Sequence, residues 1–263
     1  MNRLIALDLD GTLLNPDHQI TPRTNLAVRN LVKSGWHVCL ASGRMHQSTA
    51  GFGQQLGLTG PTISYNGSIV RLTTGEEWLN LSVPAEIASE VVTYCHQNNL
   101  HLNYYLNDQL YIAEETNWSA FYVRQTGSYL NVVGDLSQFD GQCPTKLIII
   151  QDIPTADKLV IGMRDRFGDS VYVLKTNPEY VEFMNPSANK GAALSVVAEK
   201  LGVLQKDVWA VGDAENDIPM VMWAGTGIAM KNGYASVIEA ADRVIGRNDE
   251  EGLATYLEEL AAT

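Results

Sequence analysis

Asp8 and Asp10 stand two residues apart at the end of the apolar run that begins at Leu4, and a Gly-Thr pair follows them. A glycine at this point is typical of a turn. Two neighbouring carboxylates can bind a divalent cation, or one can act as a nucleophile while the other transfers a proton. They can also be no more than a solvated strand end, and these residues alone do not decide between the two.

Polar residues also follow other apolar runs of the chain. Ser42, Gly43 and Arg44 come after the run that starts at Trp36, and Asp213 follows a run near residue 210. Ligands bind outside the carboxyl ends of the strands in open parallel sheets. We therefore expect the acids, the hydroxyl group and the glycines to gather at one edge of a sheet.

The residue types at this edge suit the chemistry of phosphate esters. Carboxylates near one point repel each other unless a cation is present, and hard oxygen ligands without His or Cys suit Mg²⁺. Lys190 opens a predicted helix that leads back to the same edge. With Ser42 and the Gly43 amide, its ammonium group could bind phosphate oxygens. An aspartate could then form an aspartyl-phosphate while a second aspartate moves the proton.

The elements that would position these residues alternate between strand and helix at both ends of the chain. We predict strands over 4–9, 36–41 and 208–211, and helices over 21–33, 45–56 and 190–201. Near-continuous apolar strands that alternate with helices are typical of a parallel sheet covered on both faces. The fold class is therefore α/β, with a Rossmann-like parallel core.

The middle of the chain has a different pattern. A helix over 84–97 precedes two strand-like runs, 101–106 and 109–113, which are joined by the turn residues Asn107 and Asp108. Helix and paired strands recur three times before residue 187, which indicates an α+β module with an antiparallel sheet. We expect residues 1–82 and 188–263 to form the core and residues 83–187 to be inserted into it.

Composition narrows the possible partners. The 263 residues carry a net charge of −12 and no basic patch, which argues against binding to nucleic acid or an anionic membrane. The N-terminal segment does not resemble a signal peptide, and no apolar run approaches the roughly 20 residues that span a bilayer. Three widely spaced cysteines without a CxxC pair favour reduced thiols in the cytoplasm over a zinc site.

Four segments of the chain resemble, in order, the four motifs of the haloacid dehalogenase superfamily. These are DLDGT at 8–12, ASGR at 41–44, the lysine of NKGAAL at 189–194, and GDAENDIPM at 212–220. A large insertion between the second and third motifs resembles the Cof-type phosphatases, whose α/β cap is of type two. The tail at 248–260 is similar to the final helix of that subfamily.

The resemblance implies a role for each matching residue. Asp8 would be the nucleophile and Asp10 the general acid and base. Asp8, the Asp10 carbonyl and Asp213 would hold Mg²⁺, and Asp217 would contact these ligands without binding the metal directly. The phosphoryl group would be bound by the remaining matched residues: Leu9 through its amide, Ser42, Gly43, Lys190 and Asn216. The implied activity is Mg²⁺-dependent hydrolysis of small phosphorylated metabolites, with sugar phosphates as the leading class; the alternatives are a phosphomutase and a non-catalytic sensor of phospho-ligands.

Each of these residues also has an ordinary structural interpretation. Ser42 could cap the following helix, Lys190 could lie on the surface, and Asp217 could cap the helix after Asn216. Two further features have structural interpretations as well: Arg44 as a structural or peripheral residue, and Asn66-Gly67 as a hairpin turn between Ile63 and Val70.

Within the cap, Glu182 and Asn185 are candidates for contacts with the substrate. Nothing in the sequence indicates an oligomeric state.

Overall fold

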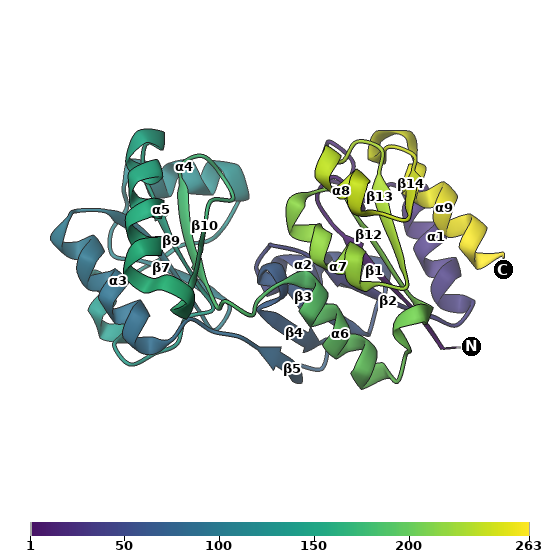
Figure 1. The fold of residues 1–263 in the computed structure, drawn as a ribbon, viewed down its shortest axis with the longest axis horizontal. Helices are drawn as coiled ribbons and strands as arrows, with labels where there is room; N and C mark the ends of the chain where they lie inside the picture. The colour runs from purple at the N-terminus through teal and green to yellow at the C-terminus, as the bar shows by residue number, and fades with distance from the viewer. Residues whose placement is uncertain (1, 263) are drawn as a thin grey trace. The chain divides into compact units, whose positions relative to one another are not determined.

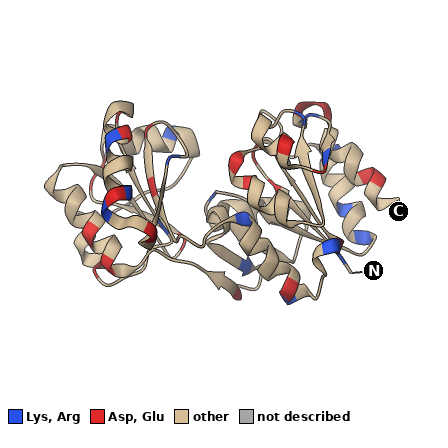
Figure 2. Ribbon diagram, viewed as in Figure 1, with Lys and Arg blue, Asp and Glu red and all other residues tan. Residues whose placement is uncertain are grey.

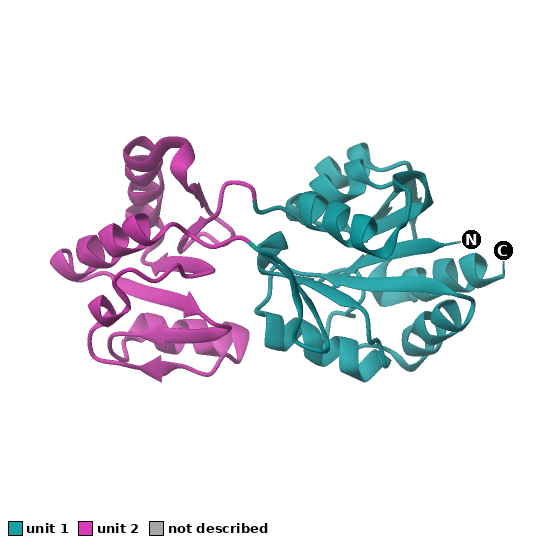
Figure 3. Cartoon of the chain, turned by 90° about the horizontal axis from the view of Figure 1, so that it is seen from below, with its two compact units in different colours: residues 1–80, 188–263 teal, residues 81–187 magenta. Residues whose placement is uncertain are grey.

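The computed structural model describes residues 2–262, and the chain divides into two compact units (Figure 3). The first unit consists of Met1–Asn80 and Ala188–Thr263, and the second of Leu81–Ser187. The first unit is therefore assembled from both ends of the chain, and the second is inserted between them.

The first unit is built on one eight-stranded sheet (Figure 1). Its strands are β1 (Arg3–Asp8), β2 (Trp36–Ala41), β3 (Pro61–Ser64), β4 (Ile69–Leu72), β5 (Glu77–Asn80), β12 (Val208–Gly212), β13 (Thr226–Met230) and β14 (Arg243–Ile245). Their order is β14-β13-β12-β1-β2-β3-β4-β5. The strands from β14 to β3 are parallel, and β4 and β5 add an antiparallel edge. The predicted α/β core is confirmed. The predicted hairpin at Asn66-Gly67 is confirmed as well, since Ile63 of β3 pairs antiparallel with Val70 of β4, whereas the edge strand β5 was not predicted.

Helices cover both faces of this sheet, which is why its strands are apolar on both sides. They are α1 (Pro22–Lys33), α2 (His46–Leu56), α6 (Lys190–Leu201), α7 (Ile218–Trp223), α8 (Ala235–Ala240) and α9 (Gly252–Ala261). On one face Ile5 of β1 lies in a core cluster with Leu31 of α1 and Leu257 of α9. On the other face Leu4 belongs to a cluster with Leu194 of α6.

The start of α1 illustrates how local sequence sets a helix boundary. Thr21 is the N-cap, and its side chain accepts a hydrogen bond from the backbone N–H of Thr24 (3.1 Å). Pro22 occupies the first turn, where its missing N–H costs nothing. The helix ends at Lys33, Ser34 is its C-cap, and Gly35 follows with a φ of +89°. The helix predicted for this segment is confirmed.

The second unit contains a six-stranded sheet in the order β10-β11-β9-β6-β7-β8. Its elements are α3 (Ala85–Gln97), β6 (His101–Leu106), β7 (Gln109–Ile112), α4 (Asn117–Thr126), β8 (Asn131–Val132), β9 (Lys146–Ile150), α5 (Ile153–Phe167), β10 (Tyr172–Leu174) and β11 (Tyr180–Met184). All neighbours are antiparallel except β7 and β8. Leu147 and Ile149 of β9 pack in one cluster with Val91 of α3 and Val160 of α5.

Charged residues of both signs are interspersed on each unit (Figure 2). Among the helices of residues 2–262, none combines the length and apolar character needed to cross a membrane.

Candidate active site

Asp8 is the last residue of β1 and lies at the carboxyl edge of the parallel sheet, paired in register with Ala41 of β2. Its side chain is buried. The chain then turns through Gly11, whose φ is +83°, and the turn is closed by a hydrogen bond from Leu14 N to Leu9 O (2.8 Å). This turn keeps the residues of the DLDGT segment at the sheet edge.

Lys190 is the first residue of α6, and its side chain is completely buried. Its Nζ donates hydrogen bonds to Asp8 Oδ1 (2.6 Å) and to Asp217 Oδ1 (2.5 Å). Burial alone would lower the pKa of Lys190, but the attraction of the Asp217 and Asp8 carboxylates outweighs it and raises the pKa above its ordinary value. The interpretation of Lys190 as a surface residue is therefore wrong.

Asp217 uses both of its carboxylate oxygens. Oδ1 accepts from Lys190, and Oδ2 accepts from the backbone N–H groups of Asp213 and Ala214, each at 3.0 Å. A Cβ at Gly212 would lie only 2.4 Å from Asp217 Cβ, so this close packing requires glycine. Asp217 is the N-cap residue of α7, as its helix-cap interpretation expects, but its side chain makes no capping bond to that helix and accepts instead from the backbone N–H of Ala214 in the preceding turn.

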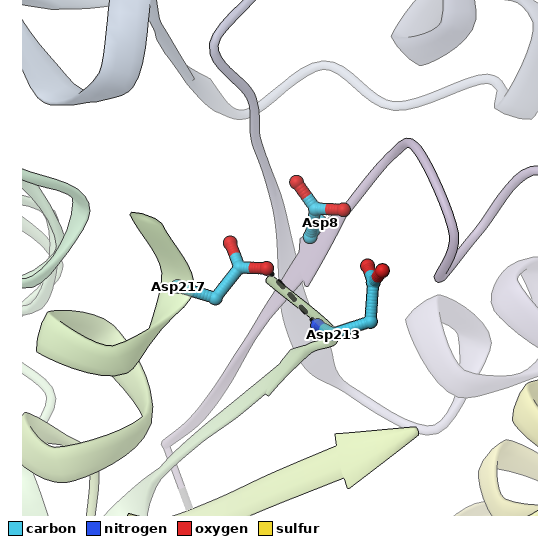
Figure 4. Close-up of side chains that lie close together, drawn as sticks. All are labelled: Asp8, Asp213 and Asp217. Atoms are coloured by element: carbon cyan, nitrogen blue, oxygen red, sulfur yellow. Dashed lines mark hydrogen bonds between the residues drawn. The ribbon is translucent and has the colours of Figure 1, made fainter. Parts of the chain in front are cut away.

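Asp213 points toward Asp8 from the end of β12 (Figure 4). Its Oδ1 accepts a hydrogen bond from Thr12 Oγ1 (2.9 Å). Burial raises the pKa of Asp213 to about 6, although the Thr12 hydroxyl opposes this shift. Burial, and then the nearby Asp217 carboxylate, raise the pKa of Asp8 well above its ordinary value. Two neighbouring carboxyl groups with raised pKa values would be stabilised in their ionised form by a cation, which indicates a cation-binding site here.

The donor set at this point fits a hard divalent cation. Asp8, Asp213 and Asp217 each offer an oxygen, and these atoms lie within 4.8 Å of one another (Figure 4). Because both oxygens of Asp217 already accept hydrogen bonds, Asp8 and Asp213 are better placed as direct ligands. All donors are oxygens, which suits Mg²⁺.

The Asp10 side chain is not part of this cluster. It is 45% exposed and forms a two-bonded ion pair with Arg44, from Nε to Oδ2 (2.8 Å) and from Nη2 to Oδ1 (2.5 Å). His18 Nδ1 lies 3.5 Å from the same carboxylate. The third clustered acid is therefore Asp217 and not Asp10, and Arg44 is a direct partner of a predicted catalytic residue.

Ser42 follows β2 at the same edge and is buried. Its Oγ accepts from the backbone N–H of Arg44 (3.1 Å). The interpretation of Ser42 as a helix cap is wrong, because α2 begins at His46 and its N-cap is Met45, which makes no side-chain capping bond. Beside it, Gly43 approaches Asn66 so closely that a Cβ would lie 2.7 Å from Asn66 Oδ1.

Asn216, predicted to contact phosphate, donates from Nδ2 to Asn66 Oδ1 (2.9 Å). Asn66 was not selected from the sequence as a site residue, because an Asn-Gly pair is the ordinary signal of a turn. Two further supporting contacts were missed: Thr12 on Asp213, and Asn232, whose Nδ2 donates to Gly11 O (2.8 Å).

The two candidate residues of the second unit have partners within that unit. Glu182 pairs with Lys146 (3.3 Å). Asn185 donates to Ser82 O (2.9 Å) and accepts from Ser187 N (2.9 Å), so it joins the segments by which the chain enters and leaves this unit. These bonds give Asn185 a structural role.

Comparison with known proteins agrees with this geometry. A family model described as haloacid dehalogenase-like hydrolase matches residues 5–257. The 5-amino-6-(5-phospho-D-ribitylamino)uracil phosphatase of Bacillus subtilis is 31% identical, with 97% of this chain and 96% of that protein covered. The HMP-PP phosphatase of Serratia proteamaculans is 27% identical over 98% and 95% of the two chains. A Thermotoga maritima crystal structure superposes with a TM-score of 0.93 at 33% identity, over 98% and 97% of the two chains.

Proposed function

The chain belongs to the haloacid dehalogenase-like hydrolases, among their Cof-type phosphatases, and we propose that it hydrolyses small phosphorylated metabolites in a Mg²⁺-dependent reaction. The observation that carries the proposal is the Asp8 carboxylate, which Lys190 holds at the sheet edge beside Asp213. Sugar phosphates are the leading substrate class. The Bacillus subtilis relative is named for a substrate with its phosphate on a ribityl group, which supports a polyol or sugar ester.

In the proposed reaction Asp8 attacks phosphorus, and the P–O bond to the leaving group breaks. Asp10 donates a proton to the departing oxygen, which leaves an aspartyl-phosphate on Asp8. Asp10 then removes a proton from water as that water attacks phosphorus. The P–O bond to Asp8 breaks, so inorganic phosphate and the free Asp8 carboxylate are released.

Asp8, Asp213 and the backbone carbonyl of Asp10 would hold Mg²⁺. The bound cation would neutralise charge on the phosphoryl oxygens. Lys190 and Ser42 are buried polar groups at the same edge, and with the Leu9 and Gly43 amides and Asn216 they would orient the phosphoryl group. Preorganised donors of this kind act most strongly where water is excluded.

We also propose a cytoplasmic location for the protein. Cys39, Cys95 and Cys143 are free thiols in the structure, which suits a reducing compartment.

The test is release of phosphate from an aryl phosphate with added Mg²⁺ and with EDTA. We expect activity only with Mg²⁺, none in Asp8→Asn, and wild-type activity in the control Asp17→Asn, which changes an exposed aspartate. Activity that persists in EDTA or in Asp8→Asn would refute the proposal. Conversion of a hexose 1-phosphate to the 6-phosphate without free phosphate would identify a phosphomutase instead, and phosphate binding without turnover would identify a sensor.

A further inference from the structure

The turn between β3 and β4 contains three consecutive residues in the left-handed region: Tyr65 (φ +50°), Asn66 (φ +55°) and Gly67 (φ +98°). Such a conformation is uncommon for residues other than glycine and is strained for a bulky one. The pairing of Ser64 with Ile69 requires a tight turn between β3 and β4, but it does not by itself require these three left-handed residues. Contacts outside the hairpin therefore have to maintain this backbone.

The first of these contacts is with the loop that carries Ser42 and Gly43. Tyr65 N donates to Arg44 O (2.9 Å), and Asn66 N donates to Ser42 O (3.0 Å). The Asn66 side chain lies against Gly43 so closely that no Cβ fits between them. The turn thus holds the backbone of this predicted phosphate-binding loop from one side.

Two more contacts reach the C-terminal part of the core. A Cβ at Gly67 would lie 2.2 Å from Asn189 O and 2.9 Å from Lys190 N, so the turn packs directly on the start of α6. The Asn66 Oδ1 atom accepts from Asn216 Nδ2 (2.9 Å). One three-residue turn therefore contacts the three segments that carry Ser42, Lys190 and Asn216.

We propose that Asn66 is a positioning residue of the phosphoryl-binding site, which orients the Asn216 amide and holds the Gly43 backbone in place. The proposal rests on the phosphate-binding function proposed above. Asparagine meets both demands of the position, because it tolerates a left-handed backbone and carries a side-chain oxygen that can accept from Asn216.

A second asparagine of the chain separates the backbone role from the side-chain role. Asn99 follows α3 with a φ of +51°, and within residues 2–262 its exposed side chain makes no hydrogen bond. Asn99→Gly is therefore a matched control for Asn66→Gly. Both substitutions keep the left-handed backbone accessible, but only the second removes a contact with the site.

The test measures binding of inorganic phosphate by calorimetry in the presence of Mg²⁺, together with kcat and KM for an aryl phosphate. We expect Asn66→Gly to weaken phosphate binding and to raise KM about tenfold, the effect of one lost hydrogen bond of about 1.4 kcal/mol. Asn66→Asp keeps the side-chain acceptor but places a negative charge beside the phosphoryl group, so it should weaken binding at least as much. Asn99→Gly should bind phosphate as the wild type does.

A double-mutant cycle with Asn216→Ala then identifies the route of the effect. If Asn66 acts through Asn216, Asn66→Gly should add little to the loss already caused by Asn216→Ala. Fully additive losses would overturn the route through Asn216, and an Asn66→Gly protein that binds phosphate as Asn99→Gly does would overturn the whole proposal. A wild type that binds phosphate but hydrolyses no ester would refute the proposed activity alone, whereas one that binds no phosphate would refute both.

Discussion

Lys190 Nζ lies 2.6 Å from Asp8 Oδ1 and 2.5 Å from Asp217 Oδ1, and the lysine side chain has no exposed surface. Asp8 and Lys190 are separated by 182 positions in the sequence. A single buried cation thus bonds two carboxylates, one at the end of β1 and the other in the turn that follows the adjacent strand β12.

Replacement of this lysine should therefore affect both folding and activity. Lys190→Met leaves two buried carboxylates without their cation, and removal of one partner of a buried ion pair costs about 3–5 kcal/mol. We expect a loss of this size in urea unfolding, together with loss of turnover. Lys200→Met, an exposed change on the same helix, should cost less than about 1 kcal/mol. Equal stability of the two variants would contradict the role of Lys190.

Substitutions of Asp10 and Asp213 should affect proton transfer and metal binding separately. We expect Asp10→Asn to lower kcat by about 10²- to 10⁴-fold, the usual contribution of a general acid or base. Because only the backbone carbonyl of Asp10 is proposed to hold Mg²⁺, this variant should keep the rise in Tm that Mg²⁺ produces. Asp213→Asn should lose that rise. An Asp10→Asn protein that no longer responds to Mg²⁺ would show that its side chain also binds the metal.

Gly11 offers a test of space at the metal site. A Cβ there would lie 2.2 Å from Asp213 Oδ2, so Gly11→Ala should displace this ligand and weaken Mg²⁺ binding about 10- to 100-fold. Gly35 has a similar φ of +89°, and nothing lies within 4 Å of its Cβ position. Gly35→Ala therefore has the same backbone strain without the clash, and it should destabilise the fold but leave the Mg²⁺ requirement unchanged. Equal Mg²⁺ requirements for the two variants would refute this interpretation.

The raised pKa of Asp213 predicts a pH-dependent response to Mg²⁺. Its pKa of about 6 in the folded state lies above the ordinary 3.8. Protonated Asp213 therefore makes its full contribution to the stability of the fold below about pH 3.8, and this contribution is lost as pH rises through about 6. Mg²⁺ competes with the proton for this carboxylate. Its stabilising effect, measured as a shift in Tm, should therefore be small near about pH 5 and larger near about pH 7.5. A shift of equal size at both pH values would contradict the prediction.

The three cysteines should differ sharply in reactivity. Burial raises the pKa of Cys39 to about 12 and that of Cys95 above its ordinary value, whereas Cys143 is exposed. Because the thiolate is the reactive form, a thiol reagent should label Cys143 alone in the folded protein and all three in denaturant. Cys143→Ser should abolish this labelling of the folded protein. Rapid labelling of Cys39 or Cys95 in the folded protein would contradict the structure.

Much of the core could be predicted because its signals are local. The Thr21 cap, the Pro22 start and the apolar runs of β1 and β2 predict the helix and strands that the structure contains. The hairpin that joins β3 to β4 was predicted from Asn66-Gly67, but the edge strand β5 was not. β5 is only four residues long, and its place in the sheet depends on pairing with β4 rather than on any pattern of its own.

The same distinction applies to the site. Parallel topology predicts that the ends of β1 and β12 meet, and the structure does bring Asp8 and Asp213 together. Topology does not predict which partner a side chain takes. Asp10 pairs with Arg44, and Asn66 with Asn216, because of contacts between segments that are remote in sequence. Asn66 also resembles an ordinary turn residue, so its second role had no sequence signal.

The central position of β1 has a consequence for synthesis of the protein. Leu4 pairs with Val208, so β1 lacks this neighbour until 204 further residues have been synthesised. At the usual rate of about 5–20 residues per second, this delay is roughly 10 to 40 s. The strands β1 to β5 and the inserted unit are complete before β12 exists, and the nascent chain therefore carries a partial apolar sheet whose β1 edge is unpaired until β12 is made. Chaperones that shield such an edge should matter more for this chain than for one whose central strands are consecutive.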